Sequence, residues 1–360
     1  MKAPAALVRG LHSAWRKKGW LSTLLLPLSW IAAAAVARKR SQFEHKPALV
    51  HHCRIPVVVV GNIYVGGTGK TPVVIALLQA LQSKGWHPGV VSRGYGVKIG
   101  DRARTGQGDL DAGQFGDEPA LIARTVGVPI SVHPDRTEAA RRLQRDFPKV
   151  DIIVADDGLQ HLALGRDLEI LVQDARGIGN GRMLPAGPLR EPAERLRYVD
   201  VIVTNLVAGQ PDPAPIDSPA RQVRMRLEPA KVEKLVSGET LNWADWLAKH
   251  GKEPAGAVAG IGQPARFFAM LRHHGLTLSQ TAGLDDHYDY AESPFEALAT
   301  PIVLTTGKDA VKCARFQDPR IWVVHAEPRF SDPGWLDHVH EMLRLIARHK
   351  ASVVPRRRGD

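Results

Sequence analysis

The sequence contains little cysteine: of its 360 residues only Cys53 and Cys313 are of this type, and they stand far apart. Two distant cysteines cannot form the disulfide framework of a small secreted domain or a cysteine-based metal site. We therefore expect the folded part of the chain to sit in a reducing compartment. The length is sufficient for two ordinary domains, and no internal repeat relates them.

The body of the chain lacks an excess of basic residues, although the formal net charge is +11, because this excess is confined to the two ends. Residues 1–50 contain nine Lys and Arg against one acid, and residues 348–360 contain five against one, so the body between them is nearly neutral. A nucleic-acid-binding ATPase would use a basic face with interleaved aromatic side chains. The body offers no such face, which argues against nucleic acid as a partner.

Charge is also missing from residues 20–37, while basic residues flank this stretch on both sides. The length is close to the shortest that can span a bilayer, but Pro27 interrupts the run, and Ser22, Thr23 and Ser29 dilute it. We expect residues 1–45 to hold a helix that inserts into a membrane or lies on it, held at anionic lipid by the basic flanks. A helix buried against the rest of the protein is the alternative.

The most informative stretch begins with four valines, residues 57–60. β-Branched residues that are apolar on both faces indicate a central strand of a parallel sheet. The core of a Walker A motif follows as Gly66, Gly67, Thr68, Gly69, Lys70 and Thr71. Glycines let backbone N–H groups approach phosphate oxygens, while the lysine adds a charge and the threonine a hydroxyl for a metal ion. Tyr64 stands where the motif has its first glycine, so a glycine-rich turn with a solvated lysine is the alternative.

A second apolar strand, residues 151–155, delivers Asp156 and Asp157 at its end, and Gln160 and His161 follow. Acidic residues in this place are typical of a Walker B element, which holds the Mg²⁺ that bridges the nucleotide phosphates. The guanine-reading motif Asn-Lys-x-Asp does not occur in the sequence. We therefore expect the nucleotide to be ATP.

Three further segments carry candidate functional residues. Arg93 and Tyr95 follow a short strand, at the end where ligands of α/β sheets bind. A surface turn with a solvated arginine is the alternative for this segment. Asp117 opens a helix, either as a catalytic acid or as an ordinary N-cap. A proline-rich loop presents Arg190 and Glu191.

The order of strands and helices predicts an α/β chain with two domains. We place the membrane-associated helix at residues 1–45, a P-loop domain at 46–207, a second and smaller α/β domain at 208–350, and a basic tail at 351–360.

These motifs resemble those of the tetraacyldisaccharide 4′-kinases, the lipid A kinases of Gram-negative bacteria. The resemblance runs from the N-terminal hydrophobic stretch to about residue 313. It rests on Gly61-Asn62, Gly66-Gly67-Thr68-Gly69-Lys70-Thr71-Pro72, Ser92-Arg93-Gly94-Tyr95-Gly96, Gly116-Asp117-Glu118-Pro119, Asp156-Asp157-Gly158-Leu159-Gln160-His161, Leu184-Pro185-Ala186-Gly187-Pro188-Leu189-Arg190-Glu191, Gly260-Ile261-Gly262, Arg266-Phe267-Phe268, Asp286-His287 and Lys308-Asp309-Ala310-Val311-Lys312. In one departure, Gly307 stands where the family usually has a glutamate.

The resemblance implies a peripheral or monotopic inner-membrane enzyme, built from two α/β/α domains, whose active site faces the cytoplasm. It would transfer the γ-phosphate of ATP to the 4′-hydroxyl of tetraacyldisaccharide 1-phosphate and so form lipid IVA. No obligate protein partner is expected. A membrane-tethered ATPase that acts as a switch is the alternative, and it would need the same phosphate-binding residues but no acceptor base.

The resemblance also implies roles for individual residues. Asp117 and His287 would activate the acceptor hydroxyl, with Lys70 on the phosphates of ATP. Mg²⁺ would be held by Thr71, Asp156 and Asp157. Candidates for contacts with the lipid substrate are Arg93, Tyr95, Gln160, His161, Arg190 and Glu191.

Overall fold

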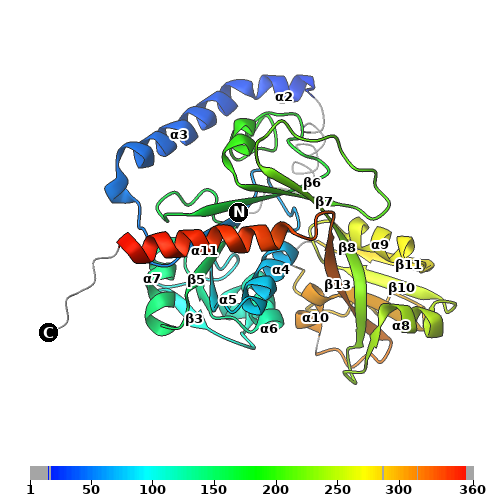
Figure 1. Ribbon diagram of the computed structural model, residues 1–360. Helices are drawn as coiled ribbons and strands as arrows, with labels where there is room; N and C mark the ends of the chain where they lie inside the picture. The colour runs from blue at the N-terminus through cyan, green and yellow to red at the C-terminus, as the bar shows by residue number, and fades with distance from the viewer. Residues whose placement is uncertain (1–14, 16–17, 286–287, 314, 354–360) are drawn as a thin grey trace. The chain divides into compact units, whose positions relative to one another are not determined.

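The computed structural model describes residues 15, 18–285, 288–313 and 315–353, and shows a mixed α/β structure with mostly parallel strand pairing (Figure 1). The chain divides into two compact units. The first is built from the described residues within Met1–Thr204, Ala214–Val223 and Asp332–Asp360, and the second from those within Asn205–Pro213 and Arg224–Ser331. The C-terminal helix therefore groups with the first unit, whereas the boundaries expected from the sequence place it in the second.

The first unit contains a sheet with the strand order β7-β6-β1-β5-β2-β4-β3. Its strands are β1 (Val57–Gly61), β2 (Pro88–Ser92), β3 (Arg104–Gly106), β4 (Ile130–Val132), β5 (Ile152–Asp156), β6 (Leu168–Asp174) and β7 (Val201–Leu206). Strand β1 pairs in parallel with β5 and β6, and β2 pairs in parallel with β5 and β4, whereas β3 runs antiparallel to β4. All four valines of β1 are fully buried, which confirms the predicted central strand.

The first unit also contains helices, several of which pack on this sheet. They are α4 (Lys70–Ser83), α5 (Ala112–Phe115), α6 (Asp117–Val126), α7 (Arg136–Asp146) and α11 (Trp335–Val353), with the 3₁₀ helices η1 (Pro47–Leu49) and η2 (Ala193–Tyr198). Figure 1 shows α11 beside α4. Lys84 forms an ion pair of 2.8 Å with Asp337, and Trp86 Nε1 donates to His340 Nδ1 at 3.0 Å. These contacts hold the C-terminal helix on the first unit.

The uncharged stretch near the N-terminus forms two helices, α2 (Trp20–Leu24) and α3 (Leu26–His45), instead of one helix over residues 20–37. Pro27 is the second residue of α3, where a proline costs no hydrogen bond. The helix therefore restarts at this point and continues through the basic residues. Among the residues that the structure describes, no helix is long and apolar enough to cross a membrane.

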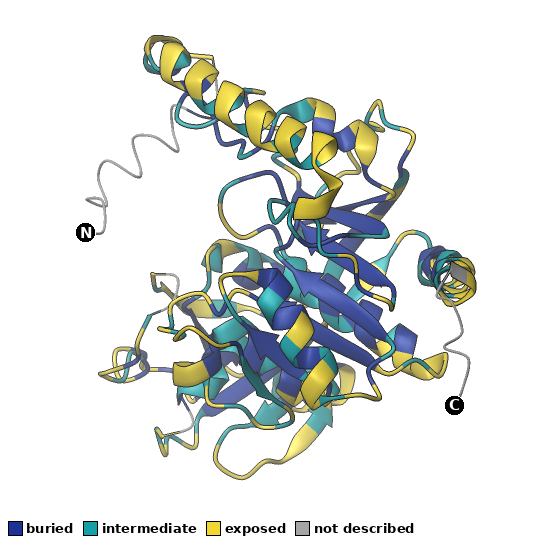
Figure 2. Ribbon diagram, turned by 90° about the vertical axis from the view of Figure 1, so that its left-hand side faces the viewer, coloured by how far each residue is buried: buried dark blue, intermediate teal, exposed yellow. Residues whose placement is uncertain are grey.

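Two of the three hydroxyl residues of this segment, Ser22 and Ser29, face the protein, whereas Thr23 is exposed. Ser22 Oγ donates to the carbonyl oxygen of Ala186 at 2.5 Å. Ser29 Oγ donates to the carbonyl oxygen of Met183 at 2.8 Å and accepts from the Ala186 N–H at 2.9 Å. Both serines are buried, whereas much of the long helix at the top of Figure 2 is exposed. The exposed large apolar side chains of α2 and α3 are Trp20, Leu24, Leu28, Trp30 and Ile31.

The second unit has its own α/β core. Its strands are β8 (Arg221–Lys234), which starts in the first unit, β9 (Thr240–Asn242), β10 (Ala255–Ala259), β11 (Leu278–Gly283), β12 (Ile302–Thr306) and β13 (Ile321–Phe330). In the order β11-β10-β12-β13 the neighbours are parallel, while β8 runs antiparallel to both β13 and β9. The helices are α8 (Trp243–His250), α9 (Pro264–His273) and α10 (Gly307–Cys313).

Candidate active site

The glycine-rich segment joins the carboxyl end of β1 to the N-terminus of α4. Gly66 and Gly69 have φ angles of 98° and 89°, which glycine adopts with little strain. The buried Asn62 side chain donates through Nδ2 to Gly66 O and to Thr68 Oγ1, each at 3.1 Å. Gly66 and Gly67 are exposed, and a Cβ added to either would meet no atom within 4 Å. The result is an open backbone turn at a helix N-terminus, which is a suitable place for an anion.

Lys70, the first residue of α4, reaches the acidic residues at the end of β5. Its Nζ lies 3.4 Å from Asp157 Oδ1. Arg190 contacts the same carboxylate, with Nη2 at 3.1 Å from Oδ1 and Nη1 at 3.3 Å from Oδ2. Burial alone would raise the pKa of Asp157, but the two cations outweigh it and lower the pKa to about 2. The structure thus brings together Lys70, Asp157 and Arg190, which come from three separate motifs.

Asp156, the last residue of β5, has a different environment. Ser92 Oγ donates to its Oδ2 at 3.3 Å, while its buried Oδ1 has no hydrogen-bond partner among the described residues. Burial, and next the charge of Glu118, raise the pKa of Asp156 to about 7. Thr71 lies in the first turn of the neighbouring α4. Within the described part of the chain, no three His, Cys, Asp or Glu side chains come close enough to hold a metal ion by themselves.

Asp117 is the first residue of α6. The N-cap position belongs to Gly116, which has a φ of 93° and no side chain that could cap the helix. The N-cap alternative therefore does not describe how this helix begins. A Cβ added to Gly116 would lie 3.1 Å from the carbonyl oxygen of Tyr95, so the start of α6 packs against the loop that follows β2. His287, the predicted partner of Asp117, lies outside the described residues.

The remaining predicted residues include exposed and buried side chains. Arg93 and Tyr95 follow β2 and are exposed. Gln160 Nε2 donates to Glu191 Oε1 at 2.5 Å, and Glu191 is buried. Burial, followed by the charges of nearby arginine and lysine side chains, lowers the pKa of His161 to about 4. His161 is therefore neutral at pH 7.

Arg176 belongs to the site, although no sequence motif identifies it. Its guanidinium lies 4.2 Å from the centroid of the Tyr64 ring, and its Nη2 donates to the carbonyl oxygen of Gly67 at 3.3 Å. Asp174, the last residue of β6, accepts from both Nε and Nη2 of Arg176. Tyr64 thus supports an arginine that contacts the glycine-rich turn. The available sequence signal is an arginine two residues after an acid at the end of a strand.

Arg136, at the start of α7, is a second arginine without a motif. It is buried, and its Nη2 donates to the carbonyl oxygen of Asp156 at 3.3 Å, while Nη1 donates to that of His133 at 3.0 Å. Burial lowers the pKa of Arg136 to about 10, against the opposing effect of Asp156 and Asp157. A buried arginine therefore contacts the backbone at the end of β5, at Asp156.

The sequence profile of the tetraacyldisaccharide-1-P 4′-kinase family matches residues 21–344. The tetraacyldisaccharide 4′-kinase of Bordetella parapertussis is 53% identical over 344 residues, which cover 96% of this chain and 99% of the relative. That of Herminiimonas arsenicoxydans is 42% identical, with coverages of 92% and 94%. A crystal structure of LpxK from Aquifex aeolicus in complex with ATP matches 91% of this chain and 99% of its own, with a TM-score of 0.74 and 26% identity. By its sequence and its fold, this chain belongs to the tetraacyldisaccharide-1-P 4′-kinase family.

Proposed function

We propose that this chain is an ATP-dependent lipid kinase that transfers the γ-phosphate of ATP to the 4′-hydroxyl of tetraacyldisaccharide 1-phosphate, forming lipid IVA in lipid A biosynthesis. The observation that carries the proposal is the arrangement at the carboxyl ends of β1 and β5. There an open glycine turn, Lys70 and Arg190 meet around Asp157. The acceptor is proposed from the names of the relatives, and the donor from the sequence motifs and the ATP-bound structure of one relative.

In this proposal the first unit works as a P-loop NTPase-like domain. Phosphoryl transfer requires alignment and charge stabilisation more than covalent help from the protein. The backbone N–H groups from Gly66 to Thr71 would bind the phosphates, and Lys70 would contact the β- and γ-phosphates. The lysine is already positioned at this edge by Asp157, which reduces the reorganisation needed during the reaction.

The residues at the end of β5 fit a divalent cation. Asp156 offers a buried carboxylate oxygen without a hydrogen-bond partner among the described residues, and Asp157 is ionised. Hard cations such as Mg²⁺ prefer oxygen ligands of this kind. We assign Asp156, Asp157 and Thr71 to hold Mg²⁺, which when bound would neutralise negative charge on the transferring phosphate.

Asp117 would accept the proton of the 4′-hydroxyl, and His287 would orient and tune this carboxylate. Contacts with the lipid headgroup and its phosphate are assigned to Arg93, Tyr95, Gln160, His161 and Arg190. Glu191, the sixth residue expected from the sequence, has a buried side chain that accepts from Gln160, so we assign it to positioning Gln160. The exposed position of Arg93 and Tyr95 after β2 supports a role in contacting a ligand.

The acyl chains of the acceptor stay in the bilayer, so the enzyme has to work at a membrane surface. We assign α2 and α3 as a peripheral or monotopic attachment to the bacterial inner membrane, with the active site facing the cytoplasm. Exposed Trp20, Trp30 and Ile31, with basic residues after them in α3, suit an anionic lipid interface. No nucleic acid or obligate protein partner is needed for this function.

Transfer of ³²P from γ-labelled ATP to tetraacyldisaccharide 1-phosphate in detergent micelles tests the proposal. The parent should label the lipid, and Asp117→Ala should label it at least about 100-fold more slowly, since a positioned general base contributes that much. Its affinity for ATP should change less than about twofold, because Asp117 is assigned to the acceptor and not to the nucleotide.

Asp101→Ala, which removes an exposed acid of the same unit, is the control and should behave like the parent. Release of phosphate by the parent without labelled lipid would contradict the proposal and favour a membrane-tethered ATPase. Near-normal labelling by Asp117→Ala would remove Asp117 from the mechanism.

A further inference from the structure

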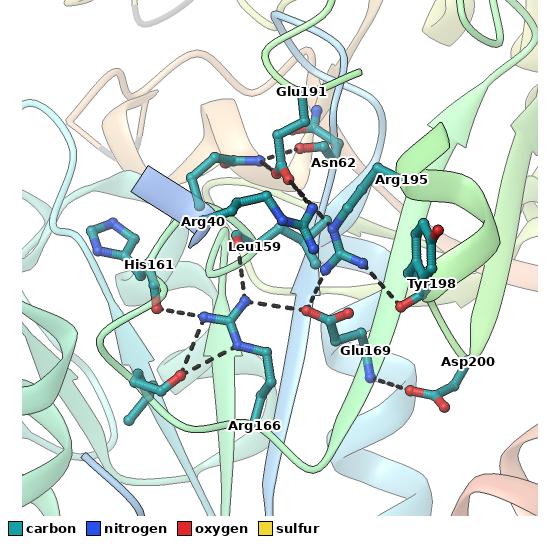
Figure 3. Close-up of polar contacts among 12 residues, drawn as sticks. Arg40, Asn62, Leu159, His161, Arg166, Glu169, Glu191, Arg195, Tyr198 and Asp200 are labelled. Carbon is teal, nitrogen blue, oxygen red and sulfur yellow. Dashed lines mark hydrogen bonds and ion pairs between the residues drawn. The ribbon is translucent and has the colours of Figure 1, made fainter. Parts of the chain in front are cut away.

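A chain of largely buried ion pairs lies beside the segment that contains Leu159 and His161 (Figure 3). Arg195, in η2, lies between two carboxylates: its Nη2 donates to Glu169 Oε1, and its Nε lies 3.4 Å from Glu191 Oε2. Glu169 is also paired with Arg166, whose Nη1 lies 3.2 Å from the same Oε1. The side chains of Arg195 and Glu191 are only 3% and 4% exposed. None of the roles assigned above uses Arg195, Glu169 or Arg166.

One end of this chain reaches the turn that follows Asp156 and Asp157. Arg166 Nη1 donates to the carbonyl oxygen of Leu159 at 2.9 Å, and Nη2 donates to those of His161 and Leu164. Backbone bonds also hold this turn: within it, His161 N–H donates to Gly158 O at 3.0 Å and Leu164 N–H donates to His161 O at 3.1 Å. Further backbone bonds join Gly158 to Val60, and Ala163 and Gly165 to His51. Arg166 therefore binds three carbonyl groups of one short turn.

The other end of the chain reaches α3. Arg40 Nη1 donates to Glu191 Oε2 at 3.4 Å, and Lys39 Nζ donates to the carbonyl oxygen of Gln160 at 3.1 Å. Because Gln160 Nε2 also donates to Glu191 Oε1, Glu191 contacts the turn directly as well as through Arg195. Two polar routes thus join the C-terminal half of α3 to the same turn.

Apolar side chains do not fill the space between α3 and the residues around Arg166 and Arg195. A cavity of about 370 Å³ lies at this place. On the side of α3 it is lined by Arg40, Phe43 and Glu44, and on the other side by Arg166, Glu169 and Arg195. Lys39 and Arg40 therefore join this part of α3 to the rest of the unit by polar contacts, whereas Ala33 and Val36, earlier in the same helix, pack on the main core cluster.

We propose that Arg195 is a positioning residue that couples the docked position of α3 to the turn at residues 158–165, and hence to Asp156 and Asp157. A buried ion pair seldom stabilises a fold more than apolar side chains of the same size, but it imposes a defined geometry on its partners. Arg195 holds Glu191 and Glu169 in one arrangement, so that a displacement of Arg40 is transmitted to Gln160 and Arg166. The effect on lipid phosphorylation rests on the proposed function, whereas the coupling itself does not.

Hydrogen exchange of the full chain tests the coupling without any lipid. Arg40→Gln removes a partly exposed side chain of α3 and should leave the fold intact. The amides of His161 and Leu164 should then exchange at least about threefold faster, because the turn loses part of its support and opens locally. Ser41→Ala, at the next and exposed position of α3, is the control and should leave them unchanged. Faster exchange that is confined to α3 in Arg40→Gln would overturn the proposal.

The kinase assay supplies a second readout. Arg195→Lys can keep only one of the two ion pairs, so kcat/KM for the lipid should fall about tenfold, as expected for misplaced catalytic groups. The KM for ATP should change less than kcat/KM for the lipid, because the network reaches the glycine-rich turn indirectly, through Gln160 Nε2, which donates to Asn62 O at 3.1 Å. The matched control is Arg197→Lys, in the same 3₁₀ helix, where the exposed arginine pairs with Asp217 at the surface.

The double variant Arg40→Gln/Arg195→Lys separates coupling from independent damage. Residues that act through one network are non-additive, so the double variant should lose no more lipid kcat/KM than the worse single variant. Losses that multiply would overturn the coupling. If the parent does not label lipid but the exchange effect is present, the proposed function fails and the coupling stands; labelled lipid with unchanged exchange in the turn refutes the coupling alone.

Discussion

The substitution Tyr64→Gly, which completes the Walker A pattern, should lower the stability of this protein. Tyr64 is 8% exposed, belongs to the main core cluster of the first unit, and lies under Arg176. Truncation of a buried aromatic side chain costs about 3–5 kcal/mol. The flexibility of glycine adds roughly 0.5–1 kcal/mol, and loss of the cation–π contact about 0.5–1 kcal/mol. We expect the free energy of unfolding of the first unit to fall by about 4–7 kcal/mol, measured by urea denaturation.

The affinity for ATP should fall as well, for a separate reason. Without the Tyr64 ring, Arg176 loses one of the contacts that hold its Nη2 against the carbonyl oxygen of Gly67. That hydrogen bond is 3.3 Å long and the arginine is one-third exposed, so we assign it about 1 kcal/mol. This corresponds to a dissociation constant for ATP that is about fivefold higher. Titration with a fluorescent ATP analogue measures it, with Arg176→Met as a second variant that leaves the core intact.

Two controls define the outcome. Tyr64→Phe keeps the ring and should lose less than about 1.5 kcal/mol of stability, whereas Tyr198→Ala removes an exposed tyrosine and should lose less than about 0.5 kcal/mol. A Tyr64→Gly variant that is as stable as the parent and binds ATP more tightly would refute the reasoning. The Walker pattern, and not the packing, would then govern position 64.

Two further predictions concern groups near the site. His161→Gln should flatten the pH dependence of stability between about 6.5 and 4. The pKa of His161 is lowered in the fold, so the unfolded chain takes up this proton first and the parent loses stability as the pH falls through that window. Urea denaturation at several pH values measures the slope of the unfolding free energy against pH. Equal slopes in variant and parent would contradict the assignment. Ser29→Ala should lower the unfolding free energy by about 1–3 kcal/mol, because it leaves the buried Ala186 N–H and Met183 carbonyl without this partner. Exchange of the Ala186 amide should rise with it, while Ser41→Ala should change neither, and a protected Ala186 amide in Ser29→Ala would argue against docking through this serine.

Local properties of the chain were sufficient to predict the central strand and the phosphate-binding turn. Four consecutive β-branched residues have few favourable conformations other than a buried strand, and β1 covers them. Glycines at positions 66 and 69 predicted a turn that the structure forms with positive φ angles. The paired aspartates were expected at the end of a strand, and β5 ends at Asp156. The family could also be predicted, because its motifs are long strings of rare combinations.

The N-terminal segment shows where local reasoning fell short. Ser22 and Ser29 read as residues that dilute an apolar run, yet they make the hydrogen bonds that dock α2 and α3 on the loop around Ala186. Whether a hydroxyl weakens a helix or docks it depends on the carbonyl and amide groups that lie opposite. Those groups are more than 150 residues away along the chain.

The sequence by itself determined the central strand, the phosphate-binding turn and the family, since each depends on neighbouring residues. Only the tertiary structure decided that Asp156 and Asp157, adjacent in sequence, have pKa values shifted in opposite directions. It also decided that Arg176 and Arg195 belong to the surroundings of the site. The reason is physical: burial and the nearest opposite charge determine what an ionisable side chain can do, and both depend on segments that folding brings together.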